Sequence, residues 1–126
     1  MLNRKLVASV LILLMFFMAG LNKAKDMKGV AKGLGMKIPK MLKTFPLTWI
    51  VLLVIAIELV CPVLVVYANL GDMDETKEQI NNWCVYILIA FTVLATLLYH
   101  PPTDKKQLMR FFINLSIIGG LVMLLE

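Results

Sequence analysis

Apolar residues along the chain fall into four long blocks, and most charged residues lie between them. The blocks cover about 5–22, 45–70, 83–100 and 108–125. A membrane-spanning helix needs about 20 mostly apolar residues, whereas a helix of a soluble bundle shows polar residues at every third or fourth position. The blocks follow the first pattern. The sequence therefore predicts an all-α, four-helix transmembrane bundle that forms one integral membrane domain, residues 1–126.

The composition agrees with a membrane protein, because 60% of the residues are apolar, against about 45–50% in typical soluble domains. The first block could instead be a secretory signal peptide, since Arg4 and Lys5 form a short basic segment before it. A signal peptide also needs small residues at the −3 and −1 positions of its cleavage site. Between residues 17 and 25 no such pair is convincing. The sequence therefore favours a retained helix.

Basic residues are distributed unevenly between the two sides of a four-span arrangement. Loops 22–44 and 100–110 together carry ten of the 13 Lys and Arg residues. Cytoplasmic loops of membrane proteins carry an excess of Lys and Arg. We therefore expect both loops in the cytoplasm and both termini on the opposite side. Arg4 and Lys5, at the start of the first block, favour the reverse orientation, but they are fewer.

The first loop, 22–44, mixes its lysines with apolar residues, which is typical of a segment that lies in the membrane interface. Three glycines and Pro39 interrupt it, so one continuous helix is not expected. A glycine-rich phosphate loop is the alternative interpretation. The stretch GVAKGLG lacks the spacing of that motif and a preceding strand, so the interfacial interpretation is preferred.

Glu58 lies near the middle of the second block, where a charged side chain costs a few kcal/mol. It is expected to face other helices, either protonated or paired with a cation. Pro62, four residues later, cannot donate the hydrogen bond that the Glu58 carbonyl would normally accept, which predicts a kinked second helix. Glu58 either ties helices together or forms a site for protons, a ligand or a redox cofactor. The sequence leaves both interpretations open.

Thr92, Thr96 and His100 follow at intervals of four residues and share one face of the third helix. The two threonines are expected to bond the carbonyls four residues before them. His100 is either a proton carrier or a cap of the helix end.

Further polar residues gather at the membrane face that bears the two basic loops. Lys23 closes the first helix, and we expect it to anchor that helix in the interface. Asn114 lies one turn inside Arg110 on the fourth helix and is expected to bond a neighbouring helix. The candidate residues of a ligand or proton pocket are therefore Glu58, His100, Asn114, Lys23 and Arg110; the helix-packing positions are Gly20, Gly119, Gly120 and Pro62.

Cys61 and Cys84 each lie within an apolar block, without the spacing of a zinc site, and are expected to be small buried residues. No metal site is predicted. The net charge of +5 arises from lysines beside membrane segments, so lipid headgroups rather than nucleic acid are the expected partner.

Three stretches, 16–26, 38–66 and 94–124, resemble the DoxX family of small four-helix membrane proteins. The ordered features that carry the resemblance are Gly20 with Lys23, then Glu58, His100, Asn114, Gly119 and Gly120. The resemblance implies a link to membrane redox systems, such as the small subunit of thiosulfate:quinone oxidoreductase or complexes that protect against oxidative stress. The chain has no haem ligand pair, iron–sulfur cysteines or flavin motif. Electron chemistry would therefore need a bound quinone or a partner subunit.

Two functions follow from these features. The first is a redox-associated or quinone-linked membrane subunit that works with other membrane or peripheral subunits. The alternative is a structural membrane protein, without catalysis, that packs into a membrane complex or into the lipid layer of a virus particle. A small transporter is a weaker third option, because no inverted repeat with paired broken helices is evident.

Overall fold

Helices account for nearly all of the chain that the computed structural model describes, which is residues 4–37, 47–99 and 103–126. No strand occurs in these ranges, so the predicted all-α fold class is confirmed. The elements in chain order are α1 (Arg4–Lys25), α2 (Met27–Lys37), α3 (Leu47–Ala68), α4 (Glu75–Tyr99), the 3-10 helix η2 (Lys105–Gln107) and α5 (Leu108–Val122).

Three of the described helices, α1, α3 and α4, are long and apolar enough to cross a membrane. The fourth predicted span corresponds to α5, which has 15 residues. At about 1.5 Å per residue, such a helix is roughly 22 Å long, shorter than the hydrocarbon core of about 30 Å. The apolar surface of these helices indicates a lipid environment.

Helix α4 begins at Glu75, well before the predicted start at residue 83. Its first turn explains the early start. The Asp74 carboxylate accepts a hydrogen bond from the Lys77 amide at 2.8 Å, as a helix-capping residue does. Glu75 and Glu78 add negative charge where the helix dipole is positive.

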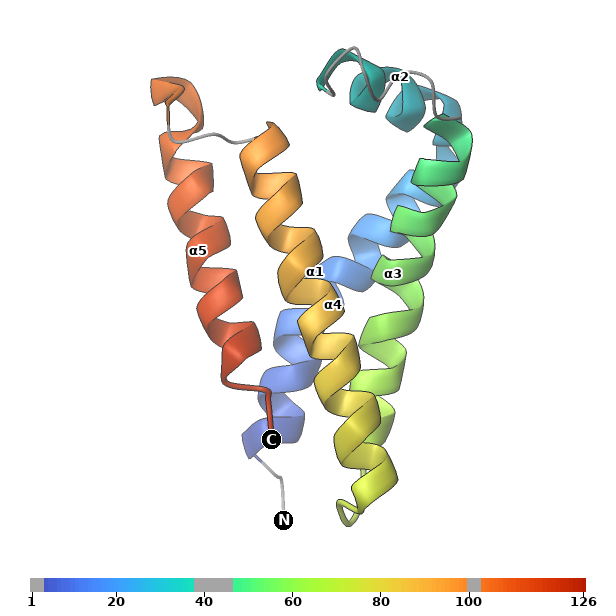
Figure 1. The fold of residues 1–126 in the computed structure, drawn as a ribbon, viewed down its shortest axis with the longest axis vertical. Coiled ribbons are helices and arrows are strands. Elements are labelled where there is room, and N and C mark those ends of the chain that lie inside the picture. The colour runs from blue at the N-terminus through green and yellow to red at the C-terminus, as the bar shows by residue number, and fades with distance from the viewer. Residues whose placement is uncertain (1–3, 38–46, 100–102) are drawn as a thin grey trace.

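Neighbouring helices pack through stripes of residues spaced three or four positions apart. The stripe of α3 contacts α1 on one side and α4 on the other, whereas α5 packs mainly against α4. Figure 1 shows α3 and α4 diverging toward the end of the molecule where α2 lies. The buried residues of α1, α3 and α4 are Ser9, Leu13, Phe16 and Gly20 in α1; Val51, Ile55, Glu58, Cys61, Pro62, Val65 and Ala68 in α3; and Asn81, Cys84, Val85, Leu88, Thr92 and Thr96 in α4.

Part of the predicted interfacial loop forms a helix, which the sequence interpretation did not expect. Helix α2 continues through three glycines from Met27 to Lys37. Its apolar face explains this, because Val30 and Leu34 pack against Val51 and Ile55 of α3. Tertiary packing therefore outweighs the poor helix propensity of glycine. Residues 38–46 lie outside the described ranges, so the interfacial placement of the loop stays a prediction.

A buried network of asparagines closes the end of the bundle opposite α2. The Asn81 side chain is fully buried; it accepts a hydrogen bond from Asn69 and donates one to the Leu124 carbonyl, each at 2.9 Å. Asn82 accepts a bond from the backbone amide of Glu126, whose side chain forms an ion pair with Lys5. These bonds hold the C-terminal segment against the start of α4. Figure 1 shows the start of α1 and the C-terminus at this end of the molecule.

Candidate functional site

An ion pair between Lys23 of α1 and Glu58 of α3 lies at the centre of the candidate site. The Glu58 side chain is 2% exposed and that of Lys23 is 30% exposed. One carboxylate oxygen, Oε1, accepts the bond from the Lys23 ammonium group. The other, Oε2, is buried without a hydrogen-bond partner among the described residues. Glu58 is therefore a buried acid that pairs with a cation through one of its two carboxylate oxygens.

Lys23 points into the protein because it continues the buried stripe of α1. Phe16 and Gly20 are buried on this stripe, and Lys23 follows Gly20 by three residues. Lys23 thus lies where its selection as a candidate pocket residue placed it, and its side chain turns to Glu58 and not away from the helices. Its ammonium group also lies 5.7 Å from the ring centroid of Phe91 in α4, within the range of a cation–π interaction. Lys23 thus connects α1 with α3 and with α4.

Gly20 allows this close contact between α1 and α3. A Cβ atom at position 20 would lie 2.9 Å from Leu59 Cδ2 and 3.1 Å from Glu58 Cβ. Such distances are below ordinary carbon–carbon contact. The absence of a side chain at Gly20 therefore lets α1 approach near enough for Lys23 to reach Glu58, and its assignment as a packing position fits this geometry.

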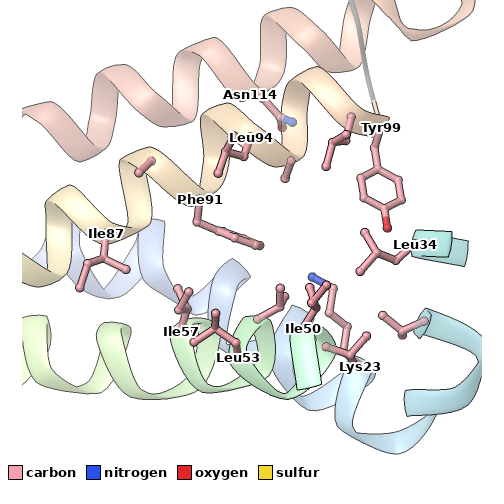
Figure 2. A pocket seen from close by; sticks show the side chains of 16 residues that line it. Lys23, Leu34, Ile50, Leu53, Ile57, Ile87, Phe91, Leu94, Tyr99 and Asn114 are labelled. Carbon is pink, nitrogen blue, oxygen red and sulfur yellow. The ribbon is translucent and has the colours of Figure 1, made fainter. Parts of the chain in front are cut away.

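A cavity of about 640 Å³ lies beside the ion pair, between α3 and α4. Figure 2 shows Ile57 and Ile87 near one end of it, Leu34 and Tyr99 near the other, and the Lys23 amine pointing inward. Apart from Lys23, Tyr99 and Asn114, every lining side chain is a hydrocarbon. Binding sites for small molecules commonly have this size and this composition, with few polar groups in an apolar wall. The sequence predicted a polar pocket, whereas the cavity is mostly apolar.

Asn114 borders the cavity from α5 and also holds α5 against α4. Its side-chain amide donates a hydrogen bond to the Thr96 hydroxyl at 3.0 Å. Thr96 and Thr92 in turn donate to the carbonyls four residues before them, as expected from the sequence. The threonine face of α4 therefore serves packing against α5. The adjacent face of the same helix, which includes Phe91 and Tyr99, lines the cavity.

Of the other predicted site residues, those that the structure describes do not join this cluster. Arg110 is exposed at the start of α5. His100 lies outside the described residues. Gly120 fits against Ile12 of α1, because a Cβ atom there would lie 3.0 Å from Ile12 Cδ1, whereas Gly119 has no such neighbour within 4 Å. Pro62 is buried inside α3, which continues through it, and it borders a smaller apolar cavity of about 380 Å³.

Sequence reasoning missed Phe91, Tyr99 and the asparagine network. In the sequence, Phe91 and Tyr99 do not differ from the other residues of their apolar block. A signal was available in their spacing, since positions 87, 91, 95 and 99 repeat at intervals of four residues and together line the cavity. No local signal distinguishes Asn69 and Asn81, because their bonds join segments that are distant in the chain.

Comparisons with protein-family models, with curated proteins and with solved structures give no match to this chain. The fold is that of an all-helical protein with three described helices long and apolar enough to cross a membrane. Membership of the DoxX family stays a prediction from the sequence pattern.

Proposed function

We propose that this protein is a DoxX-like, redox-associated membrane subunit that binds a quinone in the cavity between α3 and α4. The observation that carries the proposal is the apolar cavity with one cationic side chain, Lys23, paired to the buried acid Glu58. A quinone combines an apolar ring and tail with two carbonyl oxygens. It would supply two-electron, two-proton redox chemistry within the hydrocarbon layer.

The polar groups of the cavity suit the two ends of such a ring. Lys23 carries three N–H donors, and its ammonium group can donate one to a ring carbonyl while another holds Glu58. Glu58 does not itself line the cavity, but it can accept a proton through the Lys23 ammonium group that it holds. The Asn114 amide, oriented by its bond to Thr96, offers a further carbonyl acceptor. The aliphatic wall excludes water and receives the tail.

The proposal includes the membrane arrangement predicted from the sequence. In it α5 with its flanking residues forms a fourth span, Pro62 bends α3, and the basic segments 22–44 and 100–110 face the cytoplasm. It is supported by the described basic residues around α2 and η2, which lie at one end of the molecule, while the start of α1 and the C-terminus lie at the other (Figure 1). Ten cationic residues on one side would favour anionic headgroups.

A binding experiment with a matched control tests the quinone proposal. Ala95 lines the cavity, whereas Ala56 is exposed on α3 and lines neither described cavity. The replacement Ala95→Phe should fill the cavity and weaken the binding of a short-chain benzoquinone by roughly tenfold or more, equivalent to about 1.4 kcal/mol. Ala56→Phe should leave binding unchanged. Quenching of the fluorescence of Trp49 and Trp83 reports the binding.

Equal affinities of the two variants and the wild-type protein would show that the cavity does not hold the quinone. A loss of binding in both variants would indicate a general perturbation. Helical circular dichroism of both variants should match that of the wild-type protein, which separates a filled cavity from a misfolded bundle.

A structural role in a larger membrane assembly is the second candidate. It is favoured by α5, which packs mainly against α4 and leaves Phe112, Ile113 and Leu115 exposed. This apolar face could pack against another helix as well as against lipid. Native mass spectrometry of gently extracted protein tests this role, because a monomer that carries lipid alone would argue against it.

A further inference from the structure

The two cysteines of the chain, Cys61 and Cys84, meet between α3 and α4. Both side chains are buried in the same apolar cluster, in which the two thiols are near neighbours. Both are free thiols, and they are 7% and 6% exposed. They belong to the main apolar cluster, together with Val65 and Leu88. The sequence separated these residues into different apolar blocks, so their contact is a property of the folded chain.

The thiol pair lies next to the candidate quinone site. Ile57 and Ile87, which line the cavity, are each one helical turn from a cysteine. Glu58 precedes Cys61 by three residues on the same face of α3, a rise of about 4.5 Å. Its Oε2 atom has no hydrogen-bond partner in the described parts of the chain. A proton acceptor therefore lies one turn from one of the thiols.

The depth of the pair limits the oxidants that can reach it. Both residues lie in the interior of helices long and apolar enough to cross a membrane, about nine residues from the turn that joins α3 to α4. Water-soluble disulfides and peroxides would have to enter the hydrocarbon layer, where polar molecules are strongly disfavoured. A quinone dissolves in that layer. An oxidant of this class is therefore the chemically suitable partner.

We infer that Cys61 and Cys84 form a redox-active dithiol that a quinone bound in the adjoining cavity oxidises reversibly to a disulfide. The inference rests on the proposed function. In the forward direction two S–H bonds break and one S–S bond forms. The two electrons and two protons reduce one quinone to one quinol, so atoms and electrons balance. Glu58 acts as the general base: it accepts a thiol proton and returns it to an oxygen of the reduced quinone.

The test uses the reduced full-length protein in detergent, without oxygen, with a short-chain benzoquinone as the oxidant. Maleimide labelling after denaturation should count two thiols before the reaction and none after it. One quinol should form per protein chain. Peptide mass mapping should recover Cys61 joined to Cys84, with the loss of two hydrogen atoms.

Single replacements and a second oxidant distinguish the formation of the disulfide from the binding of the quinone. Cys61→Ser and Cys84→Ser should each retain the one remaining thiol, because neither can form the internal disulfide. Ala95→Phe should slow oxidation by the quinone roughly tenfold or more, equivalent to about 1.4 kcal/mol of barrier. Diamide, a small uncharged thiol oxidant that crosses membranes and needs no quinone site, should still oxidise Ala95→Phe at the wild-type rate.

Several results would overturn the inference, and they identify which proposal fails. If the quinone binds but both thiols persist, the dithiol inference is wrong while the proposed binding function stands. If diamide forms the disulfide but the quinone does not bind, the proposed function fails, and the inference fails with it. A mass increase from quinone attached to a single cysteine would replace the disulfide by an adduct and refute the exchange.

Discussion

The Lys23 ammonium group pairs with the Glu58 carboxylate across 35 positions of the chain, joining the end of α1 to the middle of α3. A buried ion pair is not a strong source of net stability, because removing both charges from water offsets much of their attraction. Each charged side chain nevertheless needs the other, because a buried charge without its counter-charge is strongly destabilising. The pair therefore fixes the position of α1 relative to α3 beside the cavity.

Replacing Lys23 and replacing Glu58 should lower the free energy of unfolding by different amounts. Lys23→Met leaves Glu58 buried without a cation, and we expect a loss of about 3 kcal/mol in the free energy of unfolding. Glu58→Gln leaves Lys23, whose side chain is 30% exposed and can turn toward the interface. We expect this variant to lose only about 1 kcal/mol. Reversible unfolding in mixed micelles measures both values.

The exposed Lys25, on the same helix, provides the control for the loss of a positive charge. Lys25→Met should change the free energy of unfolding by less than about 0.5 kcal/mol. An equal loss for Lys23→Met and Lys25→Met would contradict the internal ion pair.

Adding one methyl group to Gly20 should separate α1 from α3. Gly20→Ala brings a Cβ atom within 3.1 Å of Leu59 and Glu58. We expect destabilisation of about 1–3 kcal/mol, as for other overpacked contacts. Gly119→Ala is the matched control, because nothing lies within 4 Å of its added Cβ. The control should be neutral or slightly stabilising, since alanine has the higher helix propensity. Thermal unfolding curves of the two variants compare them directly.

The helical fold could be predicted from the sequence because hydrophobic blocks report on burial in lipid, which is a local property. Glu58 was selected for the same reason, since an acid in an apolar block is costly wherever it points. Gly20 and Asn114 were also identified, and both make the helix contacts expected of them. Glu58 is recognisable because an acid is unfavourable in an apolar helix. Gly20 and Asn114 are recognisable because small and amide side chains are typical of contacts between membrane helices.

The inward position of Lys23 could not be decided in the same way. A lysine near a helix end can reach either the interface or the interior. The choice depends on the rotation of α1, which follows from its contacts with α3 and α4. The meeting of Cys61 with Cys84 and of Asn69 with Asn81 has the same origin, because each contact depends on the relative register of two helices.

Asn81 should be important for holding the C-terminal segment in place. Asn81→Leu removes its bonds to Asn69 and to the Leu124 carbonyl and leaves these groups without their partner. We expect a loss of about 1–3 kcal/mol, the cost of an unsatisfied buried polar group. Amide hydrogen exchange near residues 123–126 should also become faster. The exposed Asn22 offers a control, and Asn22→Leu should leave exchange in this segment unchanged.

The contact between Lys23 and Phe91 predicts an energetic coupling between α1 and α4. Phe91→Leu keeps an apolar side chain beside the cavity but removes the ring that lies 5.7 Å from the Lys23 ammonium group. A cation–π interaction contributes about 0.5–2 kcal/mol, depending on how far the cation is desolvated. In a double-mutant cycle, Phe91→Leu should therefore cost less in the Lys23→Met background than in the wild-type protein, with a coupling energy of at least about 0.5 kcal/mol. Unfolding free energies of the four proteins give this value. Strictly additive effects would mean that Phe91 supports only the wall of the cavity and does not hold Lys23.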